Sequence, residues 1–227
     1  MKHSAVRSTA MMALAVALAY ATTAGFQKTK KAEDKKSKME HVREIGVIET
    51  SMGTVEVEFY RNDAPKTVEN FVRLAEERKY FDGMRFHRVS KNFVIQAGDV
   101  KSKDTNKVSE WGTGGQSIWG KEFADELNPN APSFKEGYKK GVLAMANRGP
   151  NTNTSQFFVM LRDNTSLPKN YTIFGKVVKG MDVVDAIGKV DIIPGQMGPT
   201  DGRPKVDVLI KKISIRKEPL PIIEEKK

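Results

Sequence analysis

The chain has 227 residues, of which 39% are hydrophobic and 29% charged, and these values fit one soluble globular domain with extensions. Lys and Arg number 38 against 28 Asp and Glu, a formal net charge of +10, yet no arginine stripe or interleaved aromatic run indicates nucleic acid as a partner. The sequence has no cysteine, which excludes disulfides, thiolate nucleophiles and cysteine-ligated metal sites.

The first 24 residues have the three parts of an export signal. Lys2 and Arg7 provide a basic start, an apolar run extends over residues 10–21, and small residues precede Gly25. The run is shorter than the roughly 20 apolar residues that span a bilayer, so no stable membrane insertion is expected after the signal is removed. We therefore predict a signal peptide over residues 1–24 and a periplasmic or secreted mature protein.

The next part of the chain changes from polar to patterned sequence. Residues 25–44 are lysine-rich without apolar periodicity, which predicts a flexible linker. Polar and apolar residues alternate strictly over residues 54–59, and a Ser-Met-Gly turn precedes them, which predicts a β-hairpin over residues 46–59. Asp63 as N-cap and Pro65 in the first turn predict a helix that ends near Arg78.

Most of the remaining sequence consists of short apolar runs that are typical of strands. A second helix fits residues 181–187, residues 100–141 read as long surface loops, and residues 217–227 as a C-terminal tail outside the barrel. About eight strands with short connections and two helices predict a mainly β fold. We expect a closed eight-stranded antiparallel β-barrel, capped by two α-helices, over residues 45–216. The strands are predicted at 84–89, 93–97, 142–145, 157–161, 172–178 and 206–215, in addition to the hairpin.

The common catalytic constellations are absent from the sequence. His87 is the single histidine of the predicted domain, and no spaced pair of metal ligands accompanies it, so it is interpreted as a structural strand residue. No Gly-x-Ser-x-Gly elbow occurs, and the glycines of 112–115 lack the Gly-Lys-Ser/Thr ending of a phosphate-binding loop. We expect no metal and no cofactor.

Two segments contain the remaining candidates for a functional site. They are residues 86–99, FHRVSKNFVIQAGD, and residues 143–158, LAMANRGPNTNTSQFF. Strand alternation places Arg88 on the face opposite His87. Each residue alone has an ordinary explanation, since a strand arginine is usually a surface residue and a strand phenylalanine usually belongs to the core.

Together the two segments resemble the cyclophilin family of peptidyl-prolyl cis–trans isomerases. The first resembles the Phe-His-Arg signature of the family, and the second its Met-Ala-Asn and Asn-Thr-Asn-x-Ser-Gln-Phe-Phe stretches. Residues 112–120 (GTGGQSIWG), 174–177 (FGKV) and 180–184 (GMDVV) also match in the same order, so the resemblance covers about 45–215. It implies a monomeric, cofactor-free isomerase that acts on proline-containing polypeptides.

The resemblance also implies the site residues, with Arg88 as the catalytic residue. It implies a proline pocket lined by Phe93, Val94, Phe158 and Leu167, with Tyr171 at the rim, and peptide contacts from Gln96, Ala146, Asn147 and Gln156. Two positions depart from the family pattern. Tyr171 stands where most members have a histidine, and Ser166 stands where many eukaryotic members have a tryptophan. We expect these departures to affect the binding of substrate and of the inhibitor cyclosporin, but not the catalytic arginine.

The reaction that this family catalyses suits a site without acid–base residues. Rotation about a peptide bond faces a barrier of about 18–20 kcal/mol, and no bond is made or broken. A fixed guanidinium that donates to the imide nitrogen in the twisted state would stabilise that state selectively. Two alternatives stay open: a non-catalytic peptide-binding or holdase module that uses the same groove, and a hydrolase or metal enzyme.

Overall fold

Residues 42–219 are described by the structure, a computed structural model of the chain. Within this part, Arg43–Glu218 form one compact unit. The predicted signal peptide, most of the predicted linker and residues 220–227 of the predicted tail lie outside the described residues.

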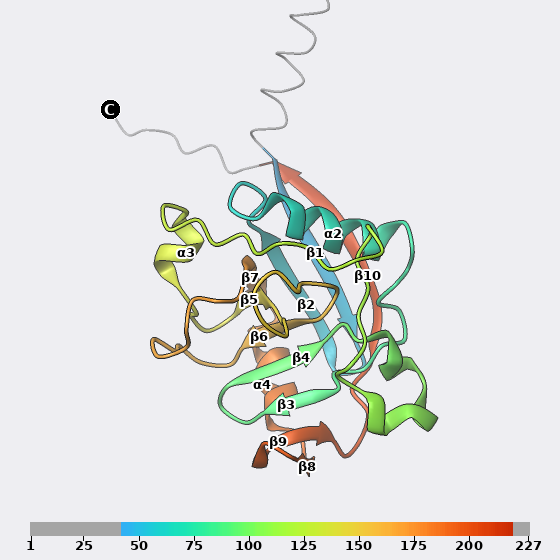
Figure 1. The fold of residues 1–227 in the computed structure, drawn as a ribbon. Coiled ribbons are helices and arrows are strands. Elements are labelled where there is room, and N and C mark those ends of the chain that lie inside the picture. The colour runs from blue at the N-terminus through green and yellow to red at the C-terminus, as the bar shows by residue number, and fades with distance from the viewer. Residues whose placement is uncertain (1–41, 220–227) are drawn as a thin grey trace, which may run out of the picture. The chain divides into compact units, whose positions relative to one another are not determined.

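The described residues form a ten-stranded antiparallel sheet (Figure 1). Its hydrogen-bonded order is β10-β1-β2-β7-β5-β6-β4-β3-β9-β8. The strands are β1 (Val42–Thr50), β2 (Gly53–Phe59), β3 (Arg88–Ser90), β4 (Val94–Ala97), β5 (Val142–Met145), β6 (Phe157–Met160), β7 (Ile173–Lys179), β8 (Ile192–Gly195), β9 (Gly198–Pro204) and β10 (Ile210–Pro219).

The prediction of a mainly β antiparallel fold with helical caps is confirmed, but the expected closed eight-stranded barrel differs in strand number and closure. The strand order ends at β10 and β8 and is not closed. The reason is that residues 85–90 change partner along one edge, from the chain before β10 to strand β9. Arg85 bridges to Leu209 just before β10, whereas Val89 and Ser90 pair with β9. Isolated backbone bonds between residues 83–86 and residues 208–210 thus stand where a continuous ladder would close the barrel.

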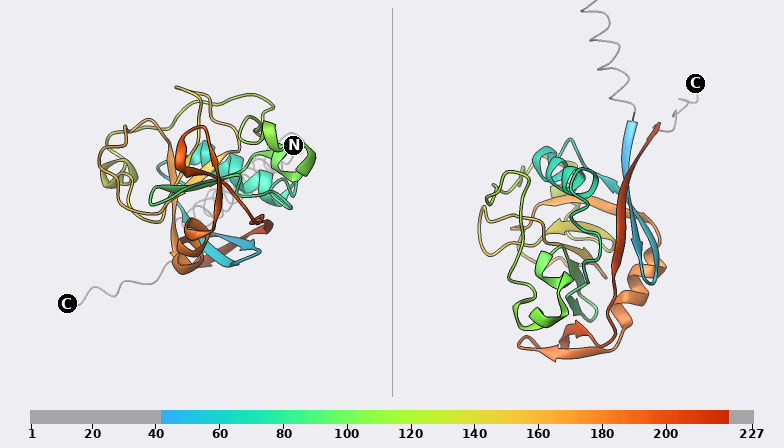
Figure 2. Two further views of the ribbon diagram at one scale, coloured as in Figure 1. Left: turned by 90° about the horizontal axis from the view of Figure 1, so that it is seen from below. Right: turned by 90° about the vertical axis from the view of Figure 1, so that its right-hand side faces the viewer.

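The α-helices of the described chain are α2 (Pro65–Glu76), the short α3 (Pro132–Glu136) and α4 (Met181–Lys189). Helices α2 and α4 lie at opposite ends of the unit, and α4 packs against β2, β3 and β4 (Figure 2). Two 3₁₀-helices, η1 (Val100–Lys103) and η2 (Thr105–Glu110), interrupt the predicted long loops.

The prediction that Asp63 caps α2 is wrong. The N-cap is Ala64 without a side-chain bond, and Asp63 Oδ2 instead accepts from the backbone N–H of Ser133 in α3 at 2.9 Å. Glu126 caps the first turn of α2 instead, since its Oε2 accepts a hydrogen bond from Thr67 N at 2.9 Å. Each carboxylate satisfies N–H groups that a helix start leaves unpaired, but it does so on a helix distant in sequence.

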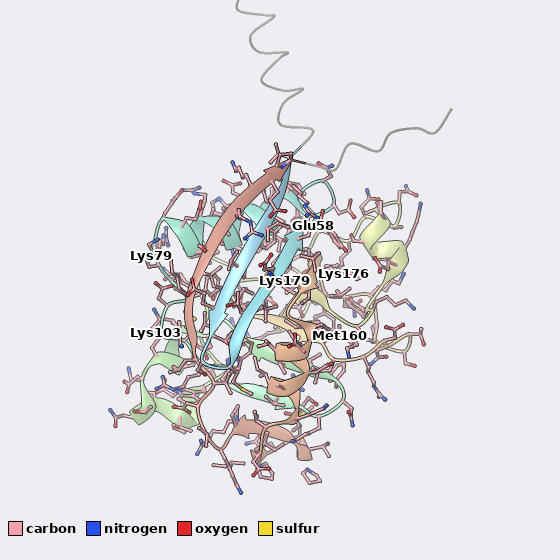
Figure 3. The ribbon with its side chains drawn as sticks, turned by 180° about the vertical axis from the view of Figure 1, so that it is seen from behind. Glu58, Lys79, Lys103, Met160, Lys176 and Lys179 are labelled. Carbon is pink, nitrogen blue, oxygen red and sulfur yellow. The ribbon has the colours of Figure 1, made fainter. Side chains whose placement is uncertain are left out.

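Both predicted boundaries of the domain are also corrected. Residues 42–44 were predicted as linker and 217–219 as tail, but they belong to β1 and β10. Arg43 Nη2 donates to Glu218 Oε2 at 2.9 Å, which joins the two strand ends. From behind, β10, β1 and β2 lie side by side, with Glu58 and Lys176 as register partners across β2 and β7 (Figure 3).

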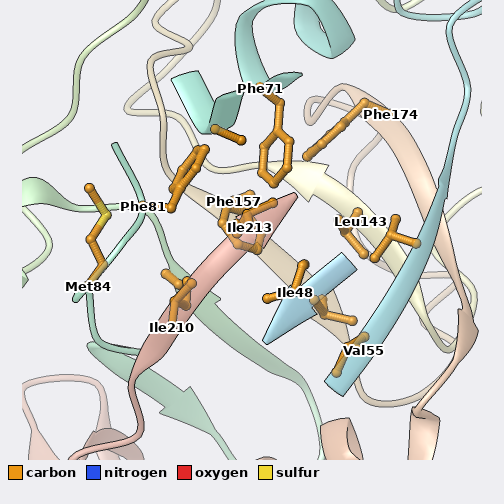
Figure 4. Close-up of a cluster of buried hydrophobic side chains, with 14 of the residues drawn as sticks. Ile48, Val55, Phe71, Phe81, Met84, Leu143, Phe157, Phe174, Ile210 and Ile213 are labelled. Carbon is orange, nitrogen blue, oxygen red and sulfur yellow. The ribbon is translucent and has the colours of Figure 1, made fainter. Parts of the chain in front are cut away.

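Aromatic rings fill the main core between α2 and the sheet (Figure 4). The ring centroid of Phe71 lies 4.7 Å from Phe81, 5.3 Å from Phe157 and 5.4 Å from Phe174. A second, smaller apolar cluster lies on β4, β5, β6 and β7. The candidate site is built on this smaller cluster.

Candidate active site

A cavity of about 170 Å³ lies over β4 and β6, at the second apolar cluster. The structure brings together there every site residue implied by the sequence except Gln156. The lining residues are Arg88, Phe93, Val94, Gln96, Ala146, Asn147, Phe158, Leu167 and Tyr171. The cavity therefore combines apolar walls with one guanidinium and two amide side chains.

The apolar walls are held in place by the cluster beneath them. Val94 and Phe158 are buried in it, and Phe93 and Leu167 pack on it partly exposed. The ring of Tyr171 meets Phe158 edge-on, with centroids 5.5 Å apart.

Hydrogen bonds fix the rim that carries Tyr171. The Tyr138 hydroxyl donates to Tyr171 O and accepts from Tyr171 N, both at 3.0 Å. Asn147 Nδ2 donates to Asn170 O at 2.8 Å, which ties the same rim to the end of β5. The cavity wall at this rim is thus fixed by side chains and backbone together.

Strand register places the polar groups of the site. Arg88 is the register partner of Gln96 on β4, and Arg88 Nη1 donates to Gln96 Oε1 at 3.0 Å. Gln96 Nε2 then donates to Gln156 Oε1 at 2.9 Å. Gln156 lies behind Gln96 rather than on the cavity wall, because its Nε2 donates to Gly112 O at 3.0 Å. Its position suits support of Gln96.

The Gly-Asp pair after β4 anchors the far end of this chain of hydrogen bonds. Asp99 Oδ2 accepts from Gly112 N at 2.5 Å and from Gly114 N at 3.1 Å, which holds the glycine loop against Gln156. Gly98 has a φ of +94°, and a Cβ there would lie 2.2 Å from Ser155 O. A glycine is therefore required for the loop to approach the site.

Asp201 on β9 is a site residue that the sequence did not indicate. Its Oδ1 accepts from Arg88 Nε at 2.9 Å, and its Oδ2 accepts from Arg88 Nη2 at 2.7 Å. Asp201 is the register partner of Ser90, and its side chain is 10% exposed against 30% for Arg88. No sequence signal could have found it, because residues 192–204 were not predicted as strands.

The charge of Asp201 persists at neutral pH. Burial raises the pKa of its carboxyl, but hydrogen bonds from Arg88 and Ser90 outweigh burial and hold the pKa below its ordinary value. A guanidinium has five N–H donors. The bonds to Asp201 and Gln96 use three of them, so two N–H groups of Arg88 stay available to a ligand.

His87 lies beside Arg88 and is buried, which agrees with its interpretation as a structural residue. Neither imidazole nitrogen has a hydrogen-bond partner in the part of the chain that the structure describes. Burial lowers the pKa of His87 to about 4, although Asp99 opposes the shift. The ring is therefore neutral at physiological pH and adds no charge next to Arg88.

Comparison with known proteins identifies the family. The family model described as cyclophilin type peptidyl-prolyl cis-trans isomerase matches residues 45–215. The chain belongs to this family. It is thus a peptidyl-prolyl cis–trans isomerase of the cyclophilin type, an enzyme that acts on proline-containing peptides.

Similar proteins cover most of the length of this cyclophilin. Peptidyl-prolyl cis-trans isomerase-like 1 of Neurospora crassa is 43% identical over 173 residues, which are 75% of this chain and 93% of the relative. The Homo sapiens protein of that name is 45% identical over 144 residues, 63% of this chain and 79% of its own. A crystal structure of a Cryptosporidium parvum cyclophilin has a TM-score of 0.66 and 30% identity, and covers 78% of this chain and 99% of its own.

Residues 42–219 of the cyclophilin lack two features, a cluster of metal-binding side chains and a helix that could span a membrane. No group of three or more His, Asp or Glu side chains lies close enough there to hold a metal ion. No helix in that stretch is both long enough and apolar enough to cross a membrane.

Proposed function

We propose that this cyclophilin accelerates X-Pro bond rotation by hydrogen bonding of Arg88 to the prolyl imide nitrogen while the proline ring occupies the apolar cavity. The observation that carries the proposal is the fixed guanidinium of Arg88, with two free N–H groups, at the edge of a cavity lined by Phe93, Phe158 and Leu167. A donor held in place before the reaction costs no reorganisation when charge develops.

The mechanism assigns different tasks to the two sides of the site. Phe93, Phe158 and Leu167 grip the proline ring, and Gln96 with the Ala146–Asn147 backbone holds the adjoining peptide on one side. The other side of the X-Pro bond then rotates. Amide resonance is lost in the twisted state, so the imide nitrogen becomes a hydrogen-bond acceptor that Arg88 can reach. Neither the neutral His87 nor the ionised Asp201 has to transfer a proton.

The test is a rate measurement with two kinds of substrate. Cis–trans exchange of a short Ala-Pro peptide, followed by NMR exchange spectroscopy, and the refolding of a protein limited by proline isomerisation should both be accelerated. Uncatalysed exchange takes tens to hundreds of seconds, so catalysis is readily detected. Peptide binding without acceleration of either reaction would favour the holdase alternative.

Asp201→Asn should lower kcat about tenfold and leave KM nearly unchanged. The amide keeps the shape of the carboxylate but loses the charge and one of the two acceptors that hold Arg88. The main effect is the loss of a fixed position for Arg88, since small misplacements of a group at the reacting centre reduce rates strongly. Steady-state kinetics on the Ala-Pro peptide measure the change.

The matched control is Asp207→Asn, which removes the carboxylate that pairs with Arg85 at 2.5 Å, away from the cavity. This variant should retain wild-type kcat within about twofold. An equal fall in both variants, or an unchanged kcat in Asp201→Asn, would count against a positioning role for Asp201.

We also propose that the enzyme is exported and acts on folding proteins outside the cytosol. What supports this is the sequence of residues 1–24, with its basic start, short apolar run and small residues before Gly25. Mature protein isolated from the native host should begin near Thr22 or Gly25 on N-terminal sequencing. Abundant cytosolic protein that retains Met1 would contradict export.

A further inference from the structure

A second cavity adjoins the first and is larger, at about 370 Å³. Arg88 and Gln96 line both cavities, and no other lining residue is shared, so these two side chains form the wall between them. The other walls come from Val108 in η2, from Trp111 directly after η2, and from the β8–β9 hairpin at the lower edge of Figure 1. The remaining lining residues are His87, Gly112, Ile193, Pro194, Gly195, Gly202 and Arg203.

The hairpin that forms this cavity has a fixed place in the fold. Gly202 is the register partner of Val89 on β3, and Asp201 next to it grips Arg88. A Cβ at Gly202 would lie 2.0 Å from Ile193 O, so the two strands of the hairpin approach as only glycine permits.

The opposite wall of the cavity is fixed as well. Trp111 Nε1 donates to Asp104 O at 3.0 Å, and the guanidinium carbon of Arg85 lies 5.6 Å from the centre of the indole. Both walls are therefore in place before any ligand arrives.

The lining combines apolar surface with one uncompensated positive charge. Val108, Trp111 and Ile193 supply the apolar part, and Ile193 is 39% exposed. Asp201 neutralises Arg88, but Arg203 forms no ion pair with any residue of the described range 42–219. No Asp or Glu lines the cavity. Charge complementarity therefore favours an acidic ligand group.

We propose that this cavity is a second substrate subsite, which receives an acidic residue of the same polypeptide whose proline occupies the first cavity. The inference rests on the proposed function and adds a preference for acidic flanking sequence. The two cavities are separated only by Arg88 and Gln96. Three extended residues reach about 10 Å, so the acidic residue lies within about three positions of the proline.

The experiment uses the enzyme with a series of peptides that contain one proline in an alanine frame. Glu, Gln or Lys is placed at each of the three positions before and after the proline, and kcat/KM is measured by NMR exchange. At one or more positions the Glu peptide should be turned over about five- to tenfold faster than the Gln peptide, and the Lys peptide more slowly. The expected ion pair between Arg203 and the peptide glutamate is partly exposed, so 0.5 M salt should reduce the preference for Glu over Gln.

Variants at Arg203 provide the decisive comparison. Arg203→Gln should abolish the preference for Glu over Gln, and Arg203→Glu should reverse the preference in favour of Lys. Lys211→Glu, the same charge change on an exposed residue of β10, should keep the wild-type preference.

Failure of this inference can be told apart from failure of the proposed function. Equal turnover of the Glu, Gln and Lys peptides at every position overturns the subsite and leaves the isomerase mechanism intact, as does an unchanged Glu preference in Arg203→Glu. Absence of catalysis even on the Gln peptides overturns the proposed function and the subsite together.

Discussion

Arg88→Ala is expected to lower kcat/KM for X-Pro isomerisation by about 10²–10³. Removal of one preorganised donor to a transition state typically costs about 3–4 kcal/mol, and each 1.36 kcal/mol corresponds to a factor of ten in rate. Arg88 provides the only guanidinium that lines the smaller cavity, so no other lining side chain of that cavity can replace it. The kcat/KM of purified wild-type and variant enzyme on the same Ala-Pro peptide measures the loss.

The same substitution should also affect stability, because Asp201 would lose its partner. The Asp201 side chain is 10% exposed, and an unpaired carboxylate at such a position typically costs about 1–3 kcal/mol of unfolding free energy. The double variant Arg88→Ala/Asp201→Ala removes both charges and should recover much of that stability. Its activity should stay as low as that of Arg88→Ala, which separates catalysis from folding.

A third variant tests geometry against charge. Arg88→Lys retains a positive charge, but an ammonium group cannot bind Asp201 side-on and Gln96 at the same time. We expect a loss of about 10- to 100-fold in kcat/KM, between those of wild type and Arg88→Ala. A kcat/KM for Arg88→Ala within threefold of wild type would refute the assigned role.

The strands and helices that could be predicted are those whose apolar residues in the sequence are also the residues buried in the structure. β5 was predicted at its observed bounds because all four of its residues are buried and apolar. The hairpin β8–β9 escaped prediction because Ile193, Pro194, Gly195 and Met197 are exposed, and proline and glycine in such a run indicate a loop. Strand β9 is held by pairing with β3, and β8 by pairing with β9, which no local pattern reveals.

The side chains that bind helix starts and hold Arg88 in place could not be predicted for a related reason. Glu126 serves α2 from 59 residues away in the sequence, and Asp201 holds Arg88 from 113 residues away. The family resemblance supplied the residues that line the cavity, since they lie in its short motifs. The resemblance did not supply Asp201 or the hairpin cavity, which depend on strand register at an edge outside those motifs.

Ser166→Trp is expected to tighten cyclosporin binding about 30- to 150-fold. Ser166 is exposed, directly before the cavity residue Leu167, and both backbone N–H groups donate to Asn164 Oδ1 at 3.0 Å. In cyclophilins with a tryptophan at this position, the indole contributes an N–H group and a large apolar face to the inhibitor. Restoring on the order of 100 Å² of contact at about 25 cal/mol per Å² amounts to roughly 2–3 kcal/mol.

Turnover of short peptides should change by only a few-fold in the same variant, because the proposed mechanism places the proline ring against Phe93 and Phe158 rather than against residue 166. Tyr171 limits the gain, since its ring packs edge-on against Phe158 and occupies part of the rim. The Kd for cyclosporin, measured by titration calorimetry, should therefore fall further in Ser166→Trp/Tyr171→His than in Ser166→Trp alone. Low-nanomolar inhibition of the unmodified enzyme would show that contacts other than the missing indole dominate cyclosporin binding.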